Sequence, residues 1–424
     1  MRYILLLLVF ALSVRISAQD SITVLQYNLL NYGNYTDYCT NGNNNHITKE
    51  GYLRTIIDYS KPDIFTVNEI TNLNFYHDRL LNEVMNSNGR GYYKRTPATN
   101  NAGSDIINMM FYDSTKFTLH SMAVIQSYIR DINLYKLYYK TGESVNGDSI
   151  FINCIVAHLK ASDGAANAEM RAEMASNVME WLGGNAYPGN YLLMGDFNLY
   201  TAQEPAYQIF TTSSAGSFQF FDPVNTPGDW NNNASFAAVH TQSVASSGNG
   251  CQASGGMDDR FDFILATDEI MEGSHNVRYK ANSYKAIGQD GNHFNISITS
   301  PPNNAVPPDV LNALGKMSDH LPVTLKIEVL TEEPGAIAEG LEFKNSTITL
   351  ISKSEAILRF TQTKSSLLFI NIYSFAGQLL SSHNENAVQG FNSISLPVGD
   401  LHPGFYLMNV HDKHGNQITL KLIK

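Results

Sequence analysis

Acidic, amide and imidazole side chains follow apolar runs in several distant parts of this sequence. In LLMGDFNLY, Asp196 and Asn198 stand two residues apart at the end of a strand-like run. On an extended chain such residues face the same side, where one can hold an attacking water and the other a phosphate oxygen. A second cluster, MSDHLPVTLKIEV, places Asp319 and His320 at the start of another apolar run. We expect a folded sheet to bring the two clusters into one site suited to hydrolysis at phosphorus.

Four further polar residues stand at the edges of expected strands, and some have simpler explanations. Asn28 in YNLLN could be only a turn former, and His158 in NCIVAHLK could be a hydrogen-bonded core residue. Glu69 follows the apolar run IFTVN, and a carboxylate at such a position needs a partner, for which a divalent cation is one candidate. Asp262 precedes the apolar run FILA. Jointly these positions predict a shared catalytic edge more strongly than any of them does alone.

The adjacent pair Asp319 and His320 sets a condition on the backbone. Neighbouring residues of an extended chain point to opposite faces. Both side chains can therefore enter one site only if the chain bends or bulges at this point.

The elements that must position these residues mix strands with helices. Alternating and buried apolar runs predict strands, whereas a 3.6-residue period with stop signals predicts helices. The expected strands cover residues 21–28, 63–70, 105–112, 118–126, 134–140, 150–157 and 191–195, and the expected helices cover 49–60, 75–86 and 165–182. This mixture favours a layered α/β sandwich over a doubly wound sheet. The long polar segments 33–48, 211–257 and 286–316 are expected to be functional or mobile loops.

The charge balance restricts the kind of binding that the chain can perform. Residues 19–340 carry 19 basic and 34 acidic side chains, a net charge of −15, against −11 for the whole chain of 424 residues. Such a balance disfavours duplex binding through a general basic surface. Compact phosphate binding at a metal ion is still allowed, because the ion supplies positive charge locally. Lys94, Arg95 and Lys160 are candidates for local phosphate contacts.

The first 18 residues have the pattern of a signal peptide. Arg2 precedes an apolar run from Ile4 to Leu12, which is too short to span a bilayer, and Ala18 fits a cleavage position. A short N-terminal anchor is the alternative. No later segment approaches about 18 uninterrupted apolar residues, so we expect export without stable membrane insertion.

The three cysteines differ in their surroundings. Cys154 lies in the strand-like FINCIVAHL and is expected to be a buried thiol. Cys39 and Cys251 lie in Asn-, Gly- and Ser-rich segments and could pair in an oxidising compartment. A structural zinc site has no support, because the sequence contains neither CxxC nor HExxH.

The chain changes character after residue 330. Residues 331–340 (TEEPGAIAEG) have the composition of a linker, and residues 341–424 contain alternating runs such as AILRF, SLLFINIYS and GFYLMNV. Turn signals separate these runs. They predict a small all-β sandwich of about seven short strands.

Six motifs in the order NLLN, VNE, AHLK, GDFN, RFDFIL and SDHLPV resemble the endonuclease/exonuclease/phosphatase superfamily, which has the DNase I-like fold. The resemblance covers nearly all of residues 21–330. It implies a four-layered α/β sandwich over residues 19–330, with the site at one rim of its paired sheets. It also implies Mg²⁺ as the cofactor, with Mn²⁺ or Ca²⁺ as other candidates. Glu69 matches the main metal ligand, with Asn28 and Asp319 near the metal.

The same resemblance implies roles for five catalytic residues. Asp196 matches the residue that orients or deprotonates the water, and Asn198 matches a positioner of phosphate or nucleophile. His320 matches the imidazole beside the scissile phosphate, with Asp262 as its orienting carboxylate. His158 matches a second histidine that binds phosphate.

His158 lacks an evident orienting partner in the sequence. Some nucleases of the superfamily orient this histidine with a Glu from the middle of the chain. Asp105 is our candidate for that role.

The C-terminal strands resemble the type A sorting domain of the type IX secretion system. The resemblance rests on INIYSFAGQLL, GFYLMNV and GNQITLKLIK. It implies that residues 341–424 are recognised by outer-membrane export machinery. A carbohydrate- or surface-binding sandwich is the alternative.

These observations predict a secreted Mg²⁺-dependent phosphodiesterase, most simply a nuclease that acts on DNA or RNA. A phosphatase or a sphingomyelinase-like lipid phosphodiesterase of the same fold is the alternative within enzymes. A non-catalytic surface-binding protein is the second alternative. We expect nucleic acid or another phosphodiester as substrate, the type IX machinery as partner, and a final location outside the cell or on its surface after passage through the periplasm.

Overall fold

A computed structural model of the chain describes residues 18–140, 149–212, 218–331, 344–362, 365–374, 377–412 and 417–424. The chain forms two compact units, residues 1–332 and residues 333–424. The expected signal peptide and linker fall almost entirely on residues 1–17 and 332–340, which lie outside the described residues. Their boundaries remain predictions.

The first sheet of unit 1 has the strand order β11-β13-β1-β2-β4-β3, with β12 paired to β13. Its strands are β1 (Ala18–Tyr32), β2 (Ile64–Thr71), β3 (Tyr93–Arg95), β4 (Ile106–Asp113), β11 (Val277–Tyr279), β12 (Lys285–Ala286) and β13 (Val323–Thr331). β1 and β2 run parallel, with Asn28 opposite Asn68. Because parallel strands end at the same edge of a sheet, the ends of β1 and β2 lie side by side.

The second sheet has the strand order β5-β6-β7-β8-β10-β9. Its strands are β5 (Phe117–Gln126), β6 (Ile132–Tyr139), β7 (Phe151–His158), β8 (Tyr191–Asp196), β9 (Phe220–Phe221) and β10 (Asp262–Thr267). β7 and β8 are parallel, with His158 opposite Asp196. β10 is antiparallel to β8, with Asp262 opposite Asp196. Three polar residues therefore stand abreast at one edge of this sheet.

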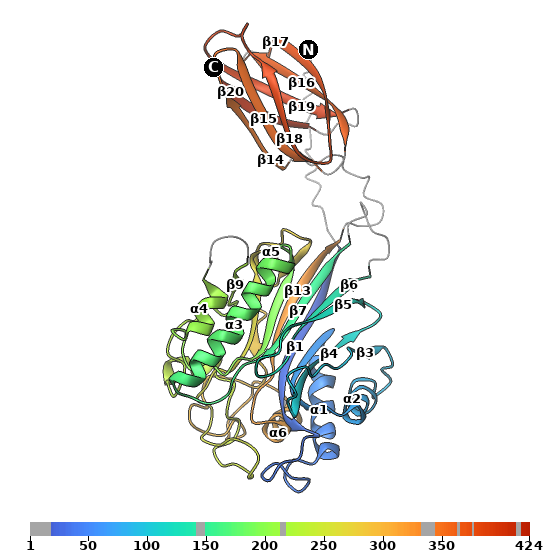
Figure 1. Ribbon diagram of the computed structural model, residues 1–424, viewed down its shortest axis with the longest axis vertical. Helices are drawn as coiled ribbons and strands as arrows, with labels where there is room; N and C mark the ends of the chain where they lie inside the picture. The colour runs from blue at the N-terminus through green and yellow to red at the C-terminus, as the bar shows by residue number, and fades with distance from the viewer. Residues whose placement is uncertain are drawn as a thin grey trace, which may run out of the picture. The chain divides into compact units, whose positions relative to one another are not determined.

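The two sheets pack face to face, and helices cover their outer faces. One apolar core contains residues of both sheets, and it also takes in residues of α1 (His46–Ser60) and α6 (Pro308–Met317). A second core lies between the second sheet and the helices α3 (Ala165–Asn185) and α4 (Pro205–Thr211). Figure 1 shows α3 and α4 on one side of the sheets and α1, α2 (Asn74–Arg79) and α6 on the other. The expected four-layered α/β sandwich is confirmed.

The helices differ from the sequence expectation in two places. The helix expected over 75–86 is α2 followed by a π-helical stretch, Leu80–Met85. The segment 286–316, expected to be a loop, ends in α6. Proline at the first helical position does not break a helix, since its missing N–H would have no partner there in any case. Two further short elements, α5 (Asp268–Glu272) and the 3₁₀ helix η3 (Ala234–Val239), follow β9 along the chain.

Unit 2 is all-β, as expected. Its strands form a sheet of order β14-β15-β18 and a sheet of order β17-β16-β19-β20. The strands are β14 (Lys344–Leu350), β15 (Glu355–Gln362), β16 (Ser366–Ser374), β17 (Leu379–Ala387), β18 (Gly390–Pro397), β19 (Phe405–Asp412) and β20 (Gln417–Ile423). Alternate side chains of both sheets, such as Leu358 and Ile370, form one separate apolar core.

Candidate active site

The site lies where the polar edges of the two sheets of unit 1 meet. Asn28, at the end of the regular part of β1, donates from Nδ2 to Glu69 Oε1 at 3.1 Å and to Asp196 Oδ2 at 2.9 Å. Glu69 belongs to the first sheet and Asp196 to the second. This amide therefore links the two sheets through their carboxylates.

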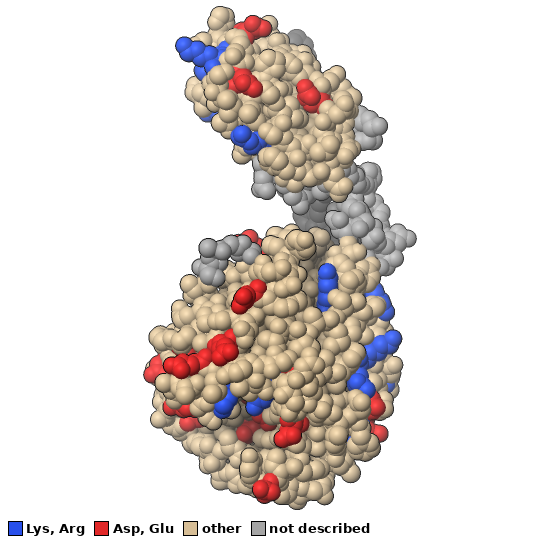
Figure 2. All heavy atoms as spheres, viewed as in Figure 1, with Lys and Arg blue, Asp and Glu red and all other residues tan. Residues whose placement is uncertain are grey.

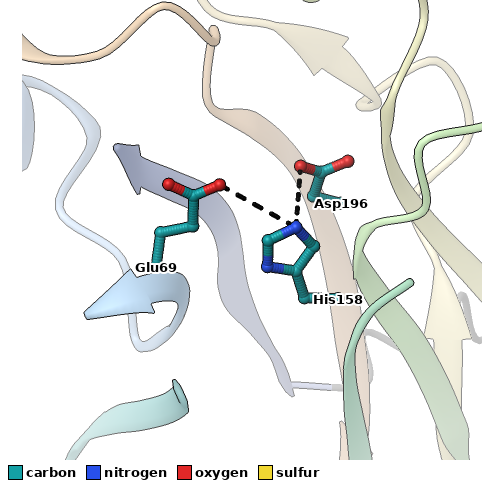
Figure 3. Close-up of side chains that lie close together, drawn as sticks. All are labelled: Glu69, His158 and Asp196. Atoms are coloured by element: carbon teal, nitrogen blue, oxygen red, sulfur yellow. Dashed lines mark ion pairs between the residues drawn. The ribbon is translucent and has the colours of Figure 1, made fainter. Parts of the chain in front are cut away.

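Glu69, His158 and Asp196 converge on one point (Figure 3). His158 Nε2 lies 3.5 Å from Asp196 Oδ2 and 3.8 Å from Glu69 Oε1. One ligand atom of each residue lies within 4.8 Å of the others, and among the described residues this is the group of acidic and imidazole side chains able to hold a metal ion.

The donor set fits a hard divalent cation. Carboxylate oxygens are the ligands that Mg²⁺ and Mn²⁺ prefer, and two converging carboxylates repel each other unless positive charge lies near them. Burial raises the pKa of Asp196 to about 7; His320 opposes this shift, while the neighbouring Asp262 and Glu69 add to it. When bound, a divalent cation would stabilise the charge on the phosphate oxygens and lower the pKa of a bound water.

Two residues of the site have a strained backbone. Glu69 and Asn198 have left-handed backbones with φ of 57° and 51°. Non-glycine residues adopt this conformation at a cost of about 1–3 kcal/mol each, and such residues cluster at functional sites. Glu69 Oε2 accepts a hydrogen bond from the Asn31 backbone N–H at 3.0 Å, so the irregular end of β1 fixes the carboxylate.

Asp196 also lies near a second imidazole, that of His320, which Asp262 holds in place. The His320 Nδ1 atom lies 2.7 Å from Asp262 Oδ2, and its Nε2 atom lies 3.7 Å from Asp196 Oδ2. Burial acts to lower the pKa of His320, but the carboxylates of Asp262, Asp196 and Asp319 outweigh it and raise the pKa. The predicted His–Asp pair is present, with Nε2 directed toward the other polar groups.

Asp319 and His320 both reach this region because the chain bends at Asp319. Asp319 Oδ1 lies 4.0 Å from His320 Nε2. Asp319 Oδ2 accepts from the backbone N–H of Ala253 at 2.9 Å. Asp319 is outside the group of three that could hold a metal, so its role as a ligand remains a prediction, as does that of Asn28.

Asn198 lies beside Asp196 rather than among the converging side chains. Its backbone N–H donates to Asp196 Oδ1 at 3.0 Å, and its side-chain amide lies 3.5 Å from the Leu159 carbonyl. This placement is compatible with positioning phosphate or water, and the role remains a prediction.

The prediction that Asp105 orients His158 is wrong. Asp105 is exposed at the start of β4, and within the described part of the chain His158 Nδ1 has no hydrogen-bond partner. Burial lowers the pKa of His158, and Arg130 and His320 lower it further. The neutral imidazole can thus serve as a ligand or a hydrogen-bond donor to phosphate.

Three residues of the site were not found from the sequence. Arg130 NH1 donates to the Leu159 carbonyl at 3.1 Å; burial lowers its pKa, while the Glu69 and Asp196 carboxylates act in the opposite direction. The amide nitrogen of Gln242 lies 2.8 Å from His320 Nε2. Asn68 Oδ1 accepts from the Asp196 backbone N–H at 2.9 Å. Arg130 lies two residues before the apolar strand β6, which could have marked it, whereas Gln242 lies in an irregular loop that gives no pattern.

The basic residues proposed for phosphate contacts are not all free. Arg95 pairs with Asp78 at 2.9 Å, and Lys160 Nζ donates to the Ala161 carbonyl at 2.8 Å. Lys94 is exposed on β3, at the edge of the first sheet. Figure 2 shows acidic and basic side chains scattered over a largely uncharged face of this unit. Arg130 is a further candidate for phosphate binding, because its buried Nε has no hydrogen-bond partner among the described residues and the Glu69 and Asp196 carboxylates act on its charge.

Residues 352–424 match the protein family described as "Secretion system C-terminal sorting domain". The expected sorting domain is thereby confirmed, and it indicates export through type IX secretion to the cell surface or the medium. None of the helices in the described ranges has the length and apolar character needed to cross a membrane.

Several solved structures resemble the chain at low sequence identity. An endonuclease/exonuclease/phosphatase family protein from Bacteroides thetaiotaomicron is 16% identical, covers 74% of this chain and 99% of its own, and gives a TM-score of 0.45. D. rerio TDP2 complexed with a single-strand DNA product is 10% identical, with 72% and 98% covered and a TM-score of 0.45. The human Nocturnin catalytic domain with bound sulfate is 14% identical, with 74% and 96% covered and a TM-score of 0.40. The search of curated proteins found no match.

Proposed function

We propose that the unit formed by residues 19–330 is a divalent-metal-dependent phosphodiesterase, and that the exported protein is a nuclease. One observation carries the proposal. Glu69, His158 and Asp196 come from three different strands, yet their ligand atoms lie within 4.8 Å of one another. Holding two carboxylates this close in a buried place is costly for folding alone. A site for a cation and a phosphate accounts for it.

The residues of the site divide the work of hydrolysis. Asp196, whose Oδ1 is already held by the Asn198 N–H, is placed to orient a water and to accept its proton. His320, held by Asp262 at 2.7 Å, can stabilise the negative phosphate oxygens or protonate the leaving oxygen. Arg130 and His158 add donors on the other side of Asp196. Mg²⁺, held by Glu69 and Asp196, is the proposed cofactor, with Mn²⁺ as the closest substitute.

Nucleic acid is the proposed substrate, although this unit is acidic. A metal site and the Arg130 guanidinium supply positive charge where the scissile phosphate must lie, so a broad basic surface is not needed. A small site of this kind suits cleavage with little sequence preference, because it contacts the backbone rather than the bases.

The test is turnover of four substrates by the purified full chain, with Mg²⁺ or with EDTA. Plasmid DNA, RNA, bis-p-nitrophenyl phosphate and sphingomyelin separate nuclease, general phosphodiesterase and lipid phosphodiesterase activities. We expect cleavage of the nucleic acids and of bis-p-nitrophenyl phosphate in Mg²⁺, and its loss in EDTA. Turnover that persists in EDTA would refute the metal-dependent mechanism. Turnover of sphingomyelin alone would refute nuclease activity and indicate a lipid phosphodiesterase.

A further inference from the structure

A disulfide joins two loops that border the candidate site. Cys39 and Cys251 are 212 residues apart in sequence and are bonded to each other. Cys39 lies in the segment between β1 and α1, and Cys251 lies between η3 and β10. The pairing that the sequence left open is therefore present, and Cys154 is a buried free thiol.

Hydrogen bonds on either side of the disulfide join the same two loops. Asn43 Nδ2 donates to the Asn249 carbonyl at 3.1 Å, and Asn249 Nδ2 donates back to the Asn43 carbonyl at 3.0 Å. The Asn249 side chain also accepts from the backbone N–H of Cys251 at 2.9 Å. The contact is thus a small interface between the loops rather than a single covalent bond.

The first loop is attached to Glu69 through Asn31, which lies in the irregular end of β1 just before the loop. Asn31 donates from its backbone to Glu69 Oε2 at 3.0 Å and from its side chain to Cys39 Sγ at 3.7 Å. The same residue therefore contacts a carboxylate of the site and a sulfur of the disulfide. Asn31 itself has a left-handed backbone, φ 50°, a conformation that needs support from its surroundings.

The second loop is attached to Asp319 and His320. Two residues after Cys251, the backbone N–H of Ala253 donates to Asp319 Oδ2 at 2.9 Å. Gln252 Nε2 lies 3.3 Å from the Ser318 carbonyl, and Gln242, earlier in the same loop, contacts His320 Nε2 at 2.8 Å. Movement of this loop would displace both Asp319 and His320.

One short path of contacts thus runs from Glu69 through Asn31 and the disulfide to Ala253 and Asp319. The carboxylates at its two ends repel each other. Glu69 and Asp319 both act on the buried Lys49, whose Nζ donates to the Leu29 and Leu30 carbonyls at 2.7 Å. The positive charge of Lys49 therefore acts on both carboxylates.

We propose that the Cys39–Cys251 disulfide is a positioning device, which holds Glu69, a proposed ligand of the cation, and the Asp319–His320 segment in the relative positions that the site needs. This inference rests on the proposed metal-dependent function. In the reducing cytoplasm the two thiols stay apart and the site is loose. In the cell envelope the bond forms with loss of two protons and two electrons, which a disulfide of an envelope oxidase accepts by thiol–disulfide exchange. The enzyme becomes fully competent only after it leaves the cytoplasm.

The experiment compares the oxidised full chain, the same protein reduced with a phosphine, and the double variant Cys39→Ala/Cys251→Ala. Mn²⁺ affinity is measured by calorimetric titration, and kcat and KM are measured with bis-p-nitrophenyl phosphate, below the melting temperature of each sample. We expect Mn²⁺ affinity and kcat to fall by about tenfold or more on reduction, the usual scale for loss of groups that orient ligands. Re-oxidation with glutathione disulfide restores both quantities, and the double variant does not respond to the phosphine.

Cys154→Ala is the matched control, because it removes the free thiol and leaves the disulfide. It should bind Mn²⁺ like the wild type and lose affinity on reduction to the same extent. If the reduced and double-variant proteins keep wild-type Mn²⁺ affinity and kcat while melting at a lower temperature, the bond only stabilises the fold and the inference is overturned. If the oxidised wild type binds Mn²⁺ in a disulfide-dependent way but hydrolyses no phosphodiester, the proposed reaction fails and the positioning role stands.

Discussion

Glu69 combines a strained backbone with a central position in the proposed site. Its carboxylate faces His158 at 3.8 Å and is held from behind by the Asn31 N–H at 3.0 Å. The side chain is therefore pre-aligned before any ligand arrives, as effective catalytic constellations require. His320 is aligned in the same way by Asp262.

Glu69→Gln and His320→Ala should each reduce kcat by about 10²-fold or more, from the size of electrostatic and acid–base contributions. The measurement is hydrolysis of bis-p-nitrophenyl phosphate in Mg²⁺, with circular dichroism to verify the fold. Glu180→Gln and His275→Ala are matched controls, because both residues are exposed outside the site and should keep wild-type rates. Full activity in the Glu69 or His320 variant would contradict its assignment.

At this scale the sequence predicted residue types well and contacts poorly. The residues expected to bind the metal or to take part in catalysis lie at the rim where the two sheets meet, whereas Asp105 does not. They could be found from the sequence because polar residues at the ends of buried strands are conspicuous. His158 was expected to bind phosphate only, yet it lies in the group that could hold a metal. The three residues of this group come from three strands, and a linear pattern cannot give the distances between strands.

Among the elements, β7 and β8 have the tightest approach that the site depends on. At Gly195, a Cβ atom would come within 1.7 Å of the Ala157 carbonyl oxygen, and φ is 152°. The two strands can therefore pair, with His158 opposite Asp196, only if residue 195 has no side chain. The glycine of the GDFN motif is a packing requirement.

Gly195→Ala should destabilise the protein by about 3 kcal/mol or more, since the backbone contact cannot relax without moving a strand. Gly183→Ala is the matched control. Gly183 lies in helix α3 with nothing within 4 Å of its added Cβ, so this change should stabilise the protein by up to about 1 kcal/mol. Denaturant unfolding of the two variants measures the difference, and equal stabilities would refute the steric argument.

Strands were easier to predict than the short helices. The buried runs of β2, β4, β7 and β8 are continuous, and their expected ranges agree with the structure to within one or two residues. Helices α4, α5 and α6 have ten residues or fewer and lie between polar loops. The apolar positions of α4 and α5 are too few to give a period. In α6 they do follow a helical spacing, at Val310, Ala313, Leu314 and Met317, but the prolines before it made the segment look like a loop.

The whole molecule combines the α/β unit, residues 1–332, with a sorting domain. We expect a chain that lacks residues 341–424 to accumulate in the cell envelope instead of reaching the surface or medium, because the matched sorting family lies within the deleted part. Cell fractionation with an antibody to unit 1 measures this distribution against the full-length chain. The retained protein should hydrolyse bis-p-nitrophenyl phosphate at the normal rate. Export of the shortened chain at the wild-type level would show that sorting signals lie elsewhere.

Within the described ranges, the apolar cores of the two units contain no common residue. Those of unit 1 are built from residues between Ile22 and Val329, and that of unit 2 from residues between Ala356 and Leu422. Each fragment released by proteolysis between the units would therefore keep an apolar interior of its own. A tail with this independence can be transferred during evolution to unrelated cargo, because neither partner has to be repacked.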